Sequence, residues 1–205
     1  MKKLVLVFVL MFSGCAIDAK YGQAGSDQFS LPIPTGKALV VLESTASIRR
    51  SARTKEGIML VVYARTNGEQ SAKEIYESGI WDFATYPGGT IPFYAGKPGH
   101  GIQAYLLDPG TYIPVRCSFD APEFEHCVPG VWKYNGRLAG NVSFTVKAGE
   151  VLNAGRFHVV SERTNYYNIE VINNHENVQE YIQSNWPSLV DDLKYSPYEV
   201  RLLRD

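Results

Sequence analysis

The stretch VSFTVKAGEVLNAGRFHVV, residues 142–160, decides the predicted fold class. Apolar and polar residues alternate from Val142 to Val146, and a period of two is typical of a strand with one buried face. Ala148-Gly149-Glu150 then supplies a turn, and the apolar run from Val151 to Val160 predicts a second strand. This part of the chain therefore favours a sheet.

Similar short apolar runs occur on both sides of this stretch. They are rich in β-branched and aromatic residues and are separated by Gly and Pro turns or by polar segments, of which 47–56 is predicted as a loop. Asp108-Pro109-Gly110 predicts a tight turn, and therefore a hairpin of the two strands beside it. The further predicted strands cover 37–43, 58–64, 80–84, 90–95, 102–107, 111–119 and 166–172. Many short strands with frequent turns predict an antiparallel β-sandwich or an open barrel.

The residues after the last of these strands change character. Apolar residues at helical spacing predict a helix over 176–185, and residues 188–193 after Pro187 predict a further helical turn. Residues 67–78 are predicted to be helical or irregular. We therefore expect a β domain over residues 37–172 and a small helical extension over residues 173–205.

Residues 1–14 have the layout of a secretory signal peptide. The basic Lys2-Lys3 precedes an apolar run from Leu4 to Phe12, which is shorter than the roughly 20 residues that span a bilayer. Ser13-Gly14-Cys15 resembles the lipobox of bacterial lipoproteins, although Phe12 stands where leucine is usual. The resemblance implies cleavage before Cys15 and lipid attachment to its sulfur. The alternative is ordinary cleavage further on, for example after Ala19, which would leave a soluble periplasmic protein.

A lipidated Cys15 would anchor the mature chain in a membrane, because several acyl chains hold firmly where one holds only marginally. Residues 15–36 are mostly polar or small, without a sustained apolar period, and we expect them to include a flexible tether after the lipidated cysteine. Ala16 replaces the aspartate that commonly retains enteric lipoproteins in the inner membrane, so the resemblance favours the outer membrane. We predict an envelope protein whose domain stands off the membrane.

The chain has three cysteines, and an exported protein seldom keeps an odd one free. If Cys15 carries lipid, Cys117 and Cys127 remain, and an oxidising compartment favours a disulfide between them. Closing that loop of about 11 residues contributes about 2.5–3 kcal/mol in the loop-entropy description. A zinc or redox site would need closer spacing or more ligands.

Two further segments carry a resemblance to a known group of proteins. They are LDPGTY at residues 107–112 and FTVKAGEV at residues 144–151, with Gly155 after the second. Together they resemble a broad group of uncharacterised bacterial envelope lipoproteins with a small prealbumin-like or carboxypeptidase-regulatory-like β-sandwich domain. The resemblance covers residues 37–172 and implies a fold and an envelope address. Because the shared residues are turn residues, it implies no catalytic residue.

Composition limits the classes of partner. The chain has 205 residues with 45% hydrophobic and 12% aromatic residues, enough for a sizeable core. Its formal net charge is −1, and loss of Lys2 and Lys3 with the signal peptide would bring it to −3. A nearly neutral chain gives no electrostatic basis for binding nucleic acid or an anionic lipid surface.

Four histidines are candidates for chemistry: His100, His126, His158 and His175. His126 stands beside Cys127 in an acidic segment, which suggests a metal site, but a disulfide at Cys127 would remove the thiolate ligand. His100 lies in a glycine-rich turn, and the neighbours of the other two define no nucleophile or base. The sequence contains no nucleophile elbow, phosphate-binding glycine loop or His-Glu-x-x-His segment. We therefore expect a protein that is not an enzyme and has no cofactor or metal.

The segment 117–140 is the predicted binding surface, with Trp132 as its candidate contact residue. A disulfide preorganises such a loop and lowers the ordering cost of binding. The sequence thus predicts an interaction or scaffold module for an envelope protein partner. The alternative is a glycan-binding module for peptidoglycan or surface polysaccharide, in which exposed aromatic rings would stack on sugars. Most aromatic residues of such a domain are nevertheless expected in its core.

Overall fold

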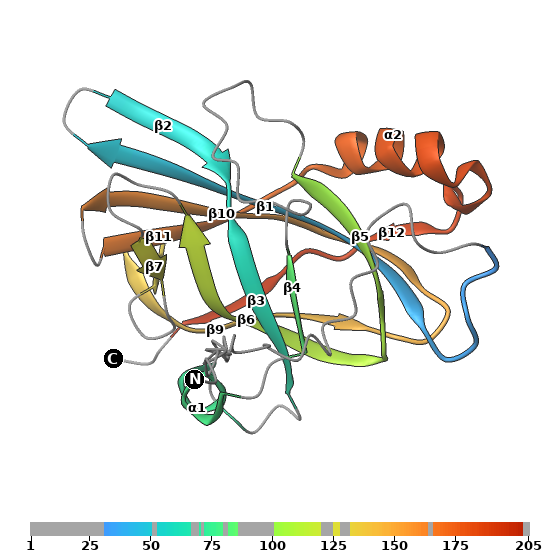
Figure 1. The fold of residues 1–205 in the computed structure, drawn as a ribbon, viewed down its shortest axis with the longest axis horizontal. Helices are drawn as coiled ribbons and strands as arrows, with labels where there is room; N and C mark the ends of the chain where they lie inside the picture. Colours follow the sequence, from blue (N-terminus) through green and yellow to red (C-terminus); the bar gives the residue numbers. More distant parts are fainter. Residues whose placement is uncertain are drawn as a thin grey trace, which may run out of the picture.

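The structure, a computed structural model, describes residues 31–50, 53–66, 70, 72–79, 82–85, 101–119, 125–127, 132–163 and 166–202. These residues form a mainly β domain with two short α-helices (Figure 1). The predicted mainly β class is confirmed.

The strands range in length from three to thirteen residues. The strands are β1 (Ala38–Arg50), β2 (Arg53–Ile58), β3 (Leu60–Thr66), β4 (Phe83–Thr85), β5 (Ile102–Leu107), β6 (Gly110–Phe119), β7 (Glu125–Cys127), β8 (Trp132–Tyr134), β9 (Arg137–Val146), β10 (Val151–Arg163), β11 (Tyr166–Ile172), β12 (Leu193–Tyr195) and β13 (Glu199–Leu202). The helices are α1 (Ala72–Ser78), α2 (His175–Asn185) and the short 3-10 helix η1 (Pro187–Leu189).

The strands form one curled sheet, a half-barrel, in the order β2-β1-β10-β11-β8-β9-β6-β3-β4. Most neighbours are antiparallel, but β10 runs parallel to β1 and β12, and β8 runs parallel to β11. The sheet is therefore mixed, whereas the sequence predicted an antiparallel sandwich or open barrel. The β1 and β10 strands are far apart in the sequence, so no turn between them signals that they pair.

A bulge in β10 changes the face to which its side chains point. Ala154 lies in the main core before the bulge and Phe157 lies in it afterwards, so the alternation shifts by one residue. Gly155 occupies the bulge with a φ of +86°, a conformation that favours glycine. The shift places Arg156 and His158 on the outer face of the sheet.

The turn at residues 108–109 is a corner between two parts of the sheet. β5 pairs with β1, whereas β6 pairs with β3 and β9, so the predicted hairpin of residues 102–107 and 111–119 is wrong. The Tyr112 hydroxyl donates a hydrogen bond of 2.8 Å to the carbonyl oxygen of Asp108, and Lys37 Nζ lies 2.8 Å from the Asp108 carboxylate. A tyrosine hydroxyl bonded to the backbone a few residues upstream fixes corners of this kind in β-sandwiches.

The polar segment 47–56, predicted as a loop, belongs mostly to a hairpin of β1 and β2. Ser47 stands opposite Glu56, and Arg50 stands opposite Arg53. β2 lies at one end of the strand order. Charged residues are common on such edge strands because they discourage pairing with other chains. The polar composition therefore marks an edge strand.

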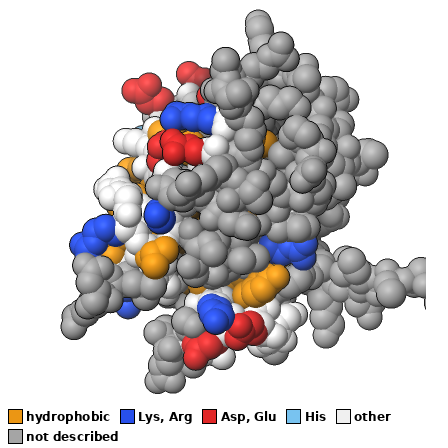
Figure 2. Space-filling view, turned by 90° about the vertical axis from the view of Figure 1, so that its left-hand side faces the viewer, with side chains coloured by type: hydrophobic (Ala, Val, Ile, Leu, Met, Phe, Trp, Pro, Cys, Tyr) orange, Lys and Arg blue, Asp and Glu red, His pale blue; other side chains and the backbone are white. Residues whose placement is uncertain are grey.

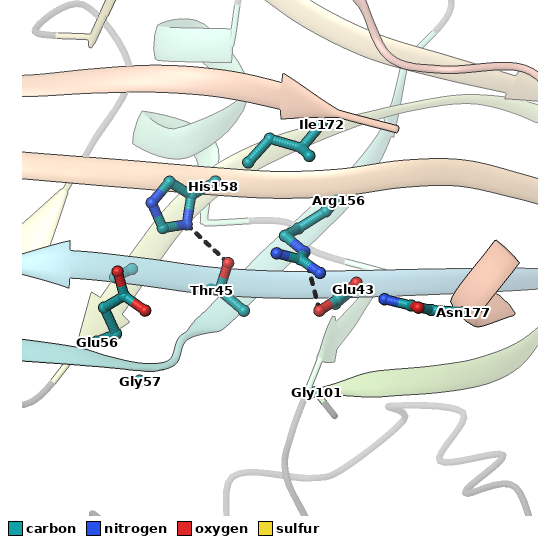
Figure 3. Close-up of a pocket in the computed structure, with 10 residues that line it drawn as sticks. Glu43, Thr45, Glu56, Gly57, Gly101, Arg156, His158, Ile172 and Asn177 are labelled. Carbon is teal, nitrogen blue, oxygen red and sulfur yellow. Dashed lines mark hydrogen bonds and ion pairs between the residues drawn. The ribbon is translucent and has the colours of Figure 1, made fainter. Parts of the chain in front are cut away.

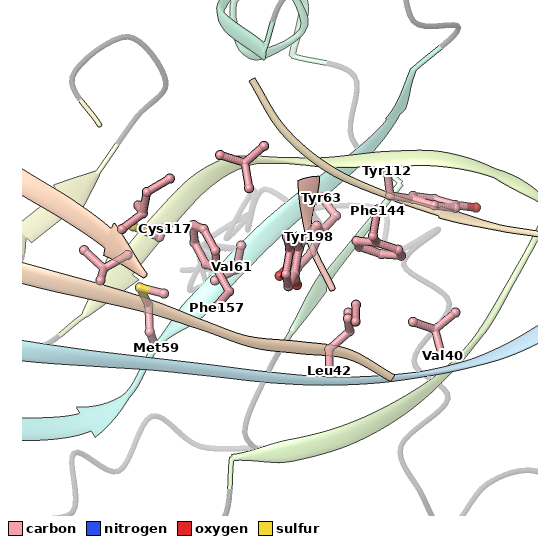
Figure 4. Packing of buried hydrophobic residues seen from close by; sticks show 14 of the residues in the cluster. Val40, Leu42, Met59, Val61, Tyr63, Tyr112, Cys117, Phe144, Phe157 and Tyr198 are labelled. Carbon is pink, nitrogen blue, oxygen red and sulfur yellow. The ribbon is translucent and has the colours of Figure 1, made fainter. Parts of the chain in front are cut away.

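The main core lies inside the half-barrel and is rich in aromatic rings (Figure 4). Phe144 stacks on Tyr112 with 5.6 Å between ring centroids, and meets Tyr63 and Tyr198 edge-on at 5.9 and 5.4 Å. The hydroxyl oxygens of Tyr63 and Tyr198 are 2.7 Å apart, so each buried hydroxyl has a partner. Burial raises the pKa of Tyr63 to about 12, so the phenol stays protonated at neutral pH.

Two helices cover parts of the outer face of the sheet. Val178 and Ile182 of α2 pack over Leu39 of β1, which confirms the predicted apolar face of this helix. Ala72 and Ile75 of α1 pack over β3 and β6. No helix in the described part of the chain has the length and hydropathy needed to cross a bilayer.

Residues 193–202 return to the sheet. β12 pairs with the start of β10, β13 pairs with β9, and Tyr198 between them enters the main core. The extension predicted for residues 173–205 is therefore helical only in its first part. η1 coincides only with the start of the helical turn predicted over residues 188–193, and Leu193 already begins β12. The two strands have three and four residues, too few for a clear alternating pattern.

Candidate functional site

A cavity of about 320 Å³ opens on the outer face of the sheet. One edge of β1 pairs first with β5, as far as Glu43, and then with β2, from Thr45 onward. The other edge of β1 pairs with β10. The cavity lies at this junction, bordered by β10 and the first turn of α2 (Figure 3). Its polar lining residues are Glu43, Thr45, Glu56, Arg156, His158 and Asn177.

Cross-strand register brings these side chains together. Glu43 stands opposite Arg156 and Thr45 stands opposite His158 in the parallel pair of β1 and β10. The pairing depends on the bulge at Gly155, because without the extra residue Arg156 and His158 would point into the apolar core. The local fold therefore creates the polar character of this surface.

Glu43 forms the buried end of the site. Its carboxylate is 2.9 Å from Nε of Arg156 and accepts a 2.7 Å hydrogen bond from Nδ2 of Asn174. The Glu43 side chain is 4% exposed and that of Arg156 is 28% exposed, so removal of either charge would leave the other poorly solvated. Asn174 is at the N-cap position of α2 but does not cap it, and its side chain instead ties the helix to Glu43.

His158 lies between two hydroxyl groups. Its Nδ1 is 2.7 Å from Oγ1 of Thr45 and its Nε2 is 3.0 Å from Oγ of Ser47, while Ser47 donates to Oε1 of Glu56 at 3.4 Å. The tautomer of His158 decides which of these two hydroxyl groups donates to the ring and which accepts from it. Burial, its largest influence, lowers the pKa of His158, and the carboxylate of Glu170 opposes this in part. His158 is therefore neutral at neutral pH.

This order of groups differs from a nucleophile with its base. In a catalytic triad the histidine accepts the proton of the nucleophile and its other nitrogen meets a carboxylate. Here Ser47 is 4% exposed and donates to a carboxylate, and the other nitrogen of His158 meets Thr45. The arrangement holds polar groups in fixed positions and suits binding.

Two side chains in the cavity keep hydrogen-bonding capacity for a ligand. No hydrogen bond joins the Nη groups of Arg156 to any residue that the structure describes, and the same holds for the side-chain amide of Asn177. Figure 3 shows both side chains directed toward Glu43, from β10 and from α2. The donors of Arg156 and the amide of Asn177 are therefore the candidate contact groups of the site.

The predicted site residues lie elsewhere. Cys15 and His100 are outside the described residues. Cys117 of β6 stands directly opposite Cys127 of β7, and facing residues of antiparallel strands have the Cα separation that a disulfide requires. The disulfide stays a prediction that this register favours.

Trp132 does not offer its ring to a partner. It is 2% exposed, and its ring packs against Phe157 with 5.8 Å between centroids. The prediction that Trp132 is a contact residue of a binding surface is therefore wrong, because the residue belongs to the core. The ring is buried because β8 pairs with β11 and β9 inside the sheet.

Exposed aromatic rings of the kind that bind sugars are scarce in the described part of the chain. Trp132 and Trp186 are buried, Trp81 lies outside it, and the exposed large hydrophobic residues within it are Leu31 and Leu138. Figure 2 shows acidic and basic side chains interspersed on one face, with small separate hydrophobic areas between them.

His175 is not among the described residues that line the cavity. His126 lies in β7, and His175 begins α2 with its ring 5.8 Å from that of Tyr195. Within the described ranges, no group of three or more His, Cys, Asp or Glu residues is arranged to hold a metal ion.

Sequence reasoning missed Glu43, Arg156 and Asn177. A usable signal was present for Arg156, because it follows a glycine that interrupts an apolar strand, and such glycines often mark bulges. No signal in the sequence linked it to Glu43.

Comparisons with known proteins add no relative. No protein-family model, no curated protein and no solved structure matches this chain. The resemblance to envelope lipoproteins with a prealbumin-like domain therefore remains a prediction.

Proposed function

We propose that this protein is a non-enzymatic, lipid-anchored envelope lipoprotein whose β domain binds a partner at the cavity between β1, β10 and α2. The observation that carries the proposal is the arrangement around Glu43, Arg156 and His158. The charges are fixed by internal contacts, yet the Nη groups of Arg156 meet the cavity without a hydrogen bond to any described residue. Such a preorganised polar surface supports recognition, because little ordering cost remains to be met on binding.

The envelope address rests on the lipobox-like Ser13-Gly14-Cys15. The first described strand begins at Ala38, so a lipid on Cys15 and the domain would be joined by a segment of about twenty residues. Ile33, near the end of that segment, already packs against the apolar cluster under α2. An anchored domain of this kind would meet partners within a short distance of the membrane.

Photo-crosslinking in the native bacterium tests the proposal. The full-length chain would carry a photo-crosslinking residue at Glu56, on the rim of the cavity, or at Lys147, an exposed control position outside its lining. The proposal predicts that a defined partner is captured at position 56 and far less at position 147. Capture that is equal at both positions, or absent at both, would contradict it.

The anchor is tested in the same cells. The wild-type chain should fractionate with membranes, whereas Cys15→Ser should be recovered as a soluble or unprocessed precursor form with the same fold by circular dichroism. Equal distribution of a normally processed wild type and Cys15→Ser would count against lipid attachment.

A further inference from the structure

Arg156 presents its guanidinium fork to the cavity. Glu43 lies 2.9 Å from Nε, on one side of the group, while no described residue accepts a hydrogen bond from its Nη groups. The two side chains form an ion pair, although the Nε–H itself makes no hydrogen bond to a described residue. The guanidinium therefore keeps N–H donors for a planar acceptor, and two parallel N–H donors match the two oxygens of a carboxylate.

The first turn of α2 adds further groups on the same side of the cavity. Asn177, in that turn, lines the cavity without a side-chain hydrogen bond to any residue in the described ranges. The neighbouring Asn174 is buried behind the lining residues, where its Nδ2 donates to the Glu43 carboxylate. The first turn of a helix also favours negative charge through its free N–H groups. The side-chain amide of Asn177 thus offers both donors and an acceptor to the cavity that Arg156 also lines.

Charge limits the kind of anion that fits. Glu43 compensates the charge of Arg156, Glu56 adds a second carboxylate at the rim, and His158 is neutral at neutral pH. A dianionic phosphate would meet two carboxylates against one guanidinium. A ligand with a single carboxylate and a nearby N–H group fits better. Arg156 would donate hydrogen bonds to the ligand's carboxylate, and the Glu56 carboxylate would accept a hydrogen bond from the ligand's N–H group.

The size of the cavity favours a small ligand or the end of a chain. At about 320 Å³ it lies at the lower end of the range typical of ligand sites. This volume suits one or two amino-acid residues. The free C-terminus of a peptide combines that size with a carboxylate and a nearby amide N–H.

We propose that the cavity captures the terminal carboxylate of a peptide, with Arg156 as its main contact and Asn177 as its second. The inference rests on the proposed function, since it names the ligand of the same surface. A peptide amide would lose the charged contact, and an internal peptide segment would bring no carboxylate to Arg156.

The test is an NMR-detected titration of the full-length chain in detergent micelles. The probes are N-acetyl-alanyl-alanine and its C-terminal amide, which differ only in the carboxylate. We expect the acid to shift the amide signals of Gly57 and Gly101, at the cavity, and to bind about tenfold or more tightly than the amide. Equal binding of the two probes, or no shift with the acid, would overturn the inference.

A matched pair of variants locates the contact. Asn177→Asp places a negative charge in the cavity, whereas Gln179→Glu adds the same charge on an exposed position of the same helix. Binding of the acid should weaken about tenfold or more in Asn177→Asp and stay within about twofold in Gln179→Glu. Arg156→Lys keeps the charge beside Glu43 but lacks the fork, and should weaken binding as well.

Unchanged binding in Asn177→Asp would overturn the proposed site. The two proposals fail differently: a partner crosslinked at position 56 together with no binding of the acid would leave the interaction module intact and remove the carboxylate ligand.

Discussion

Replacement of Gly155 by alanine tests the bulge on which the outer-face site depends. Gly155 has a φ of +86°, and a Cβ atom there would lie 3.2 Å from the carbonyl oxygen of Ile172 and 3.5 Å from the hydroxyl of Tyr195. The positive φ costs a non-glycine residue about 1–2 kcal/mol. The backbone carbonyl cannot move aside as a flexible side chain would, so we expect a total loss of about 2 kcal/mol.

Gly57→Ala is the matched control. Gly57 has no positive φ, and a Cβ atom there meets nothing within 4 Å. Alanine in this strand should therefore leave the stability unchanged or raise it by up to about 1 kcal/mol, because glycine loses more backbone entropy on folding. The two variants add the same methyl group and differ only in its surroundings.

The assay is urea denaturation followed by circular dichroism, on a soluble form of the chain that begins at Ala16. A loss of about 2 kcal/mol corresponds to a fall of about 4–8 °C in Tm for a domain of this size. If Gly155→Ala were as stable as Gly57→Ala, the bulge would not have the described geometry. The placement of Arg156 and His158 on the outer face would then lose its basis.

Three further predictions concern buried polar groups. Glu43→Ala should destabilise the domain by about 2–4 kcal/mol in the same assay, because it leaves the largely buried Arg156 without its counter-charge. Tyr63→Phe should cost about 1–2 kcal/mol, since the buried hydroxyl of Tyr198 loses its partner, and an unchanged urea midpoint would contradict that hydrogen bond. Burial lowers the pKa of His158, so the unfolded chain binds the proton first as the pH falls below about 6.5 and this group's contribution to stability declines there. Urea midpoints between pH 7.5 and 5 should therefore depend less on pH in His158→Gln than in the wild type, and identical profiles would refute this.

Local patterns predicted the strands well where one face is buried. The stretch 142–160 forms the end of β9, a turn and most of β10, and the helix predicted over 176–185 is α2 with one more residue. In these segments the hydrophobic period coincides with burial on one side. The hairpin at residues 108–110 failed because turn residues specify a reversal of the chain and not the partners of its strands.

The candidate site could not be predicted from the sequence, because long-range pairing creates it. Glu43 and Arg156 are neighbours only through the parallel pairing of β1 and β10. The side to which Arg156 points depends on the bulge at Gly155, and one residue of register decides whether a charge faces the core or the surface. Trp132 illustrates the converse, since an aromatic residue next to a predicted loop proves to be packed in the core.

Affinity isolation of the full-length chain from gently solubilised native membranes tests the central claim most directly. The wild type, Asn177→Asp and Gln179→Glu would be isolated side by side, and co-purifying proteins identified by mass spectrometry. Binding at the cavity predicts a stoichiometric partner that accompanies the wild type and Gln179→Glu but is lost with Asn177→Asp. A partner retained equally by all three proteins, or no partner with any of them, would contradict the claim that this cavity is the binding site of an anchored interaction module.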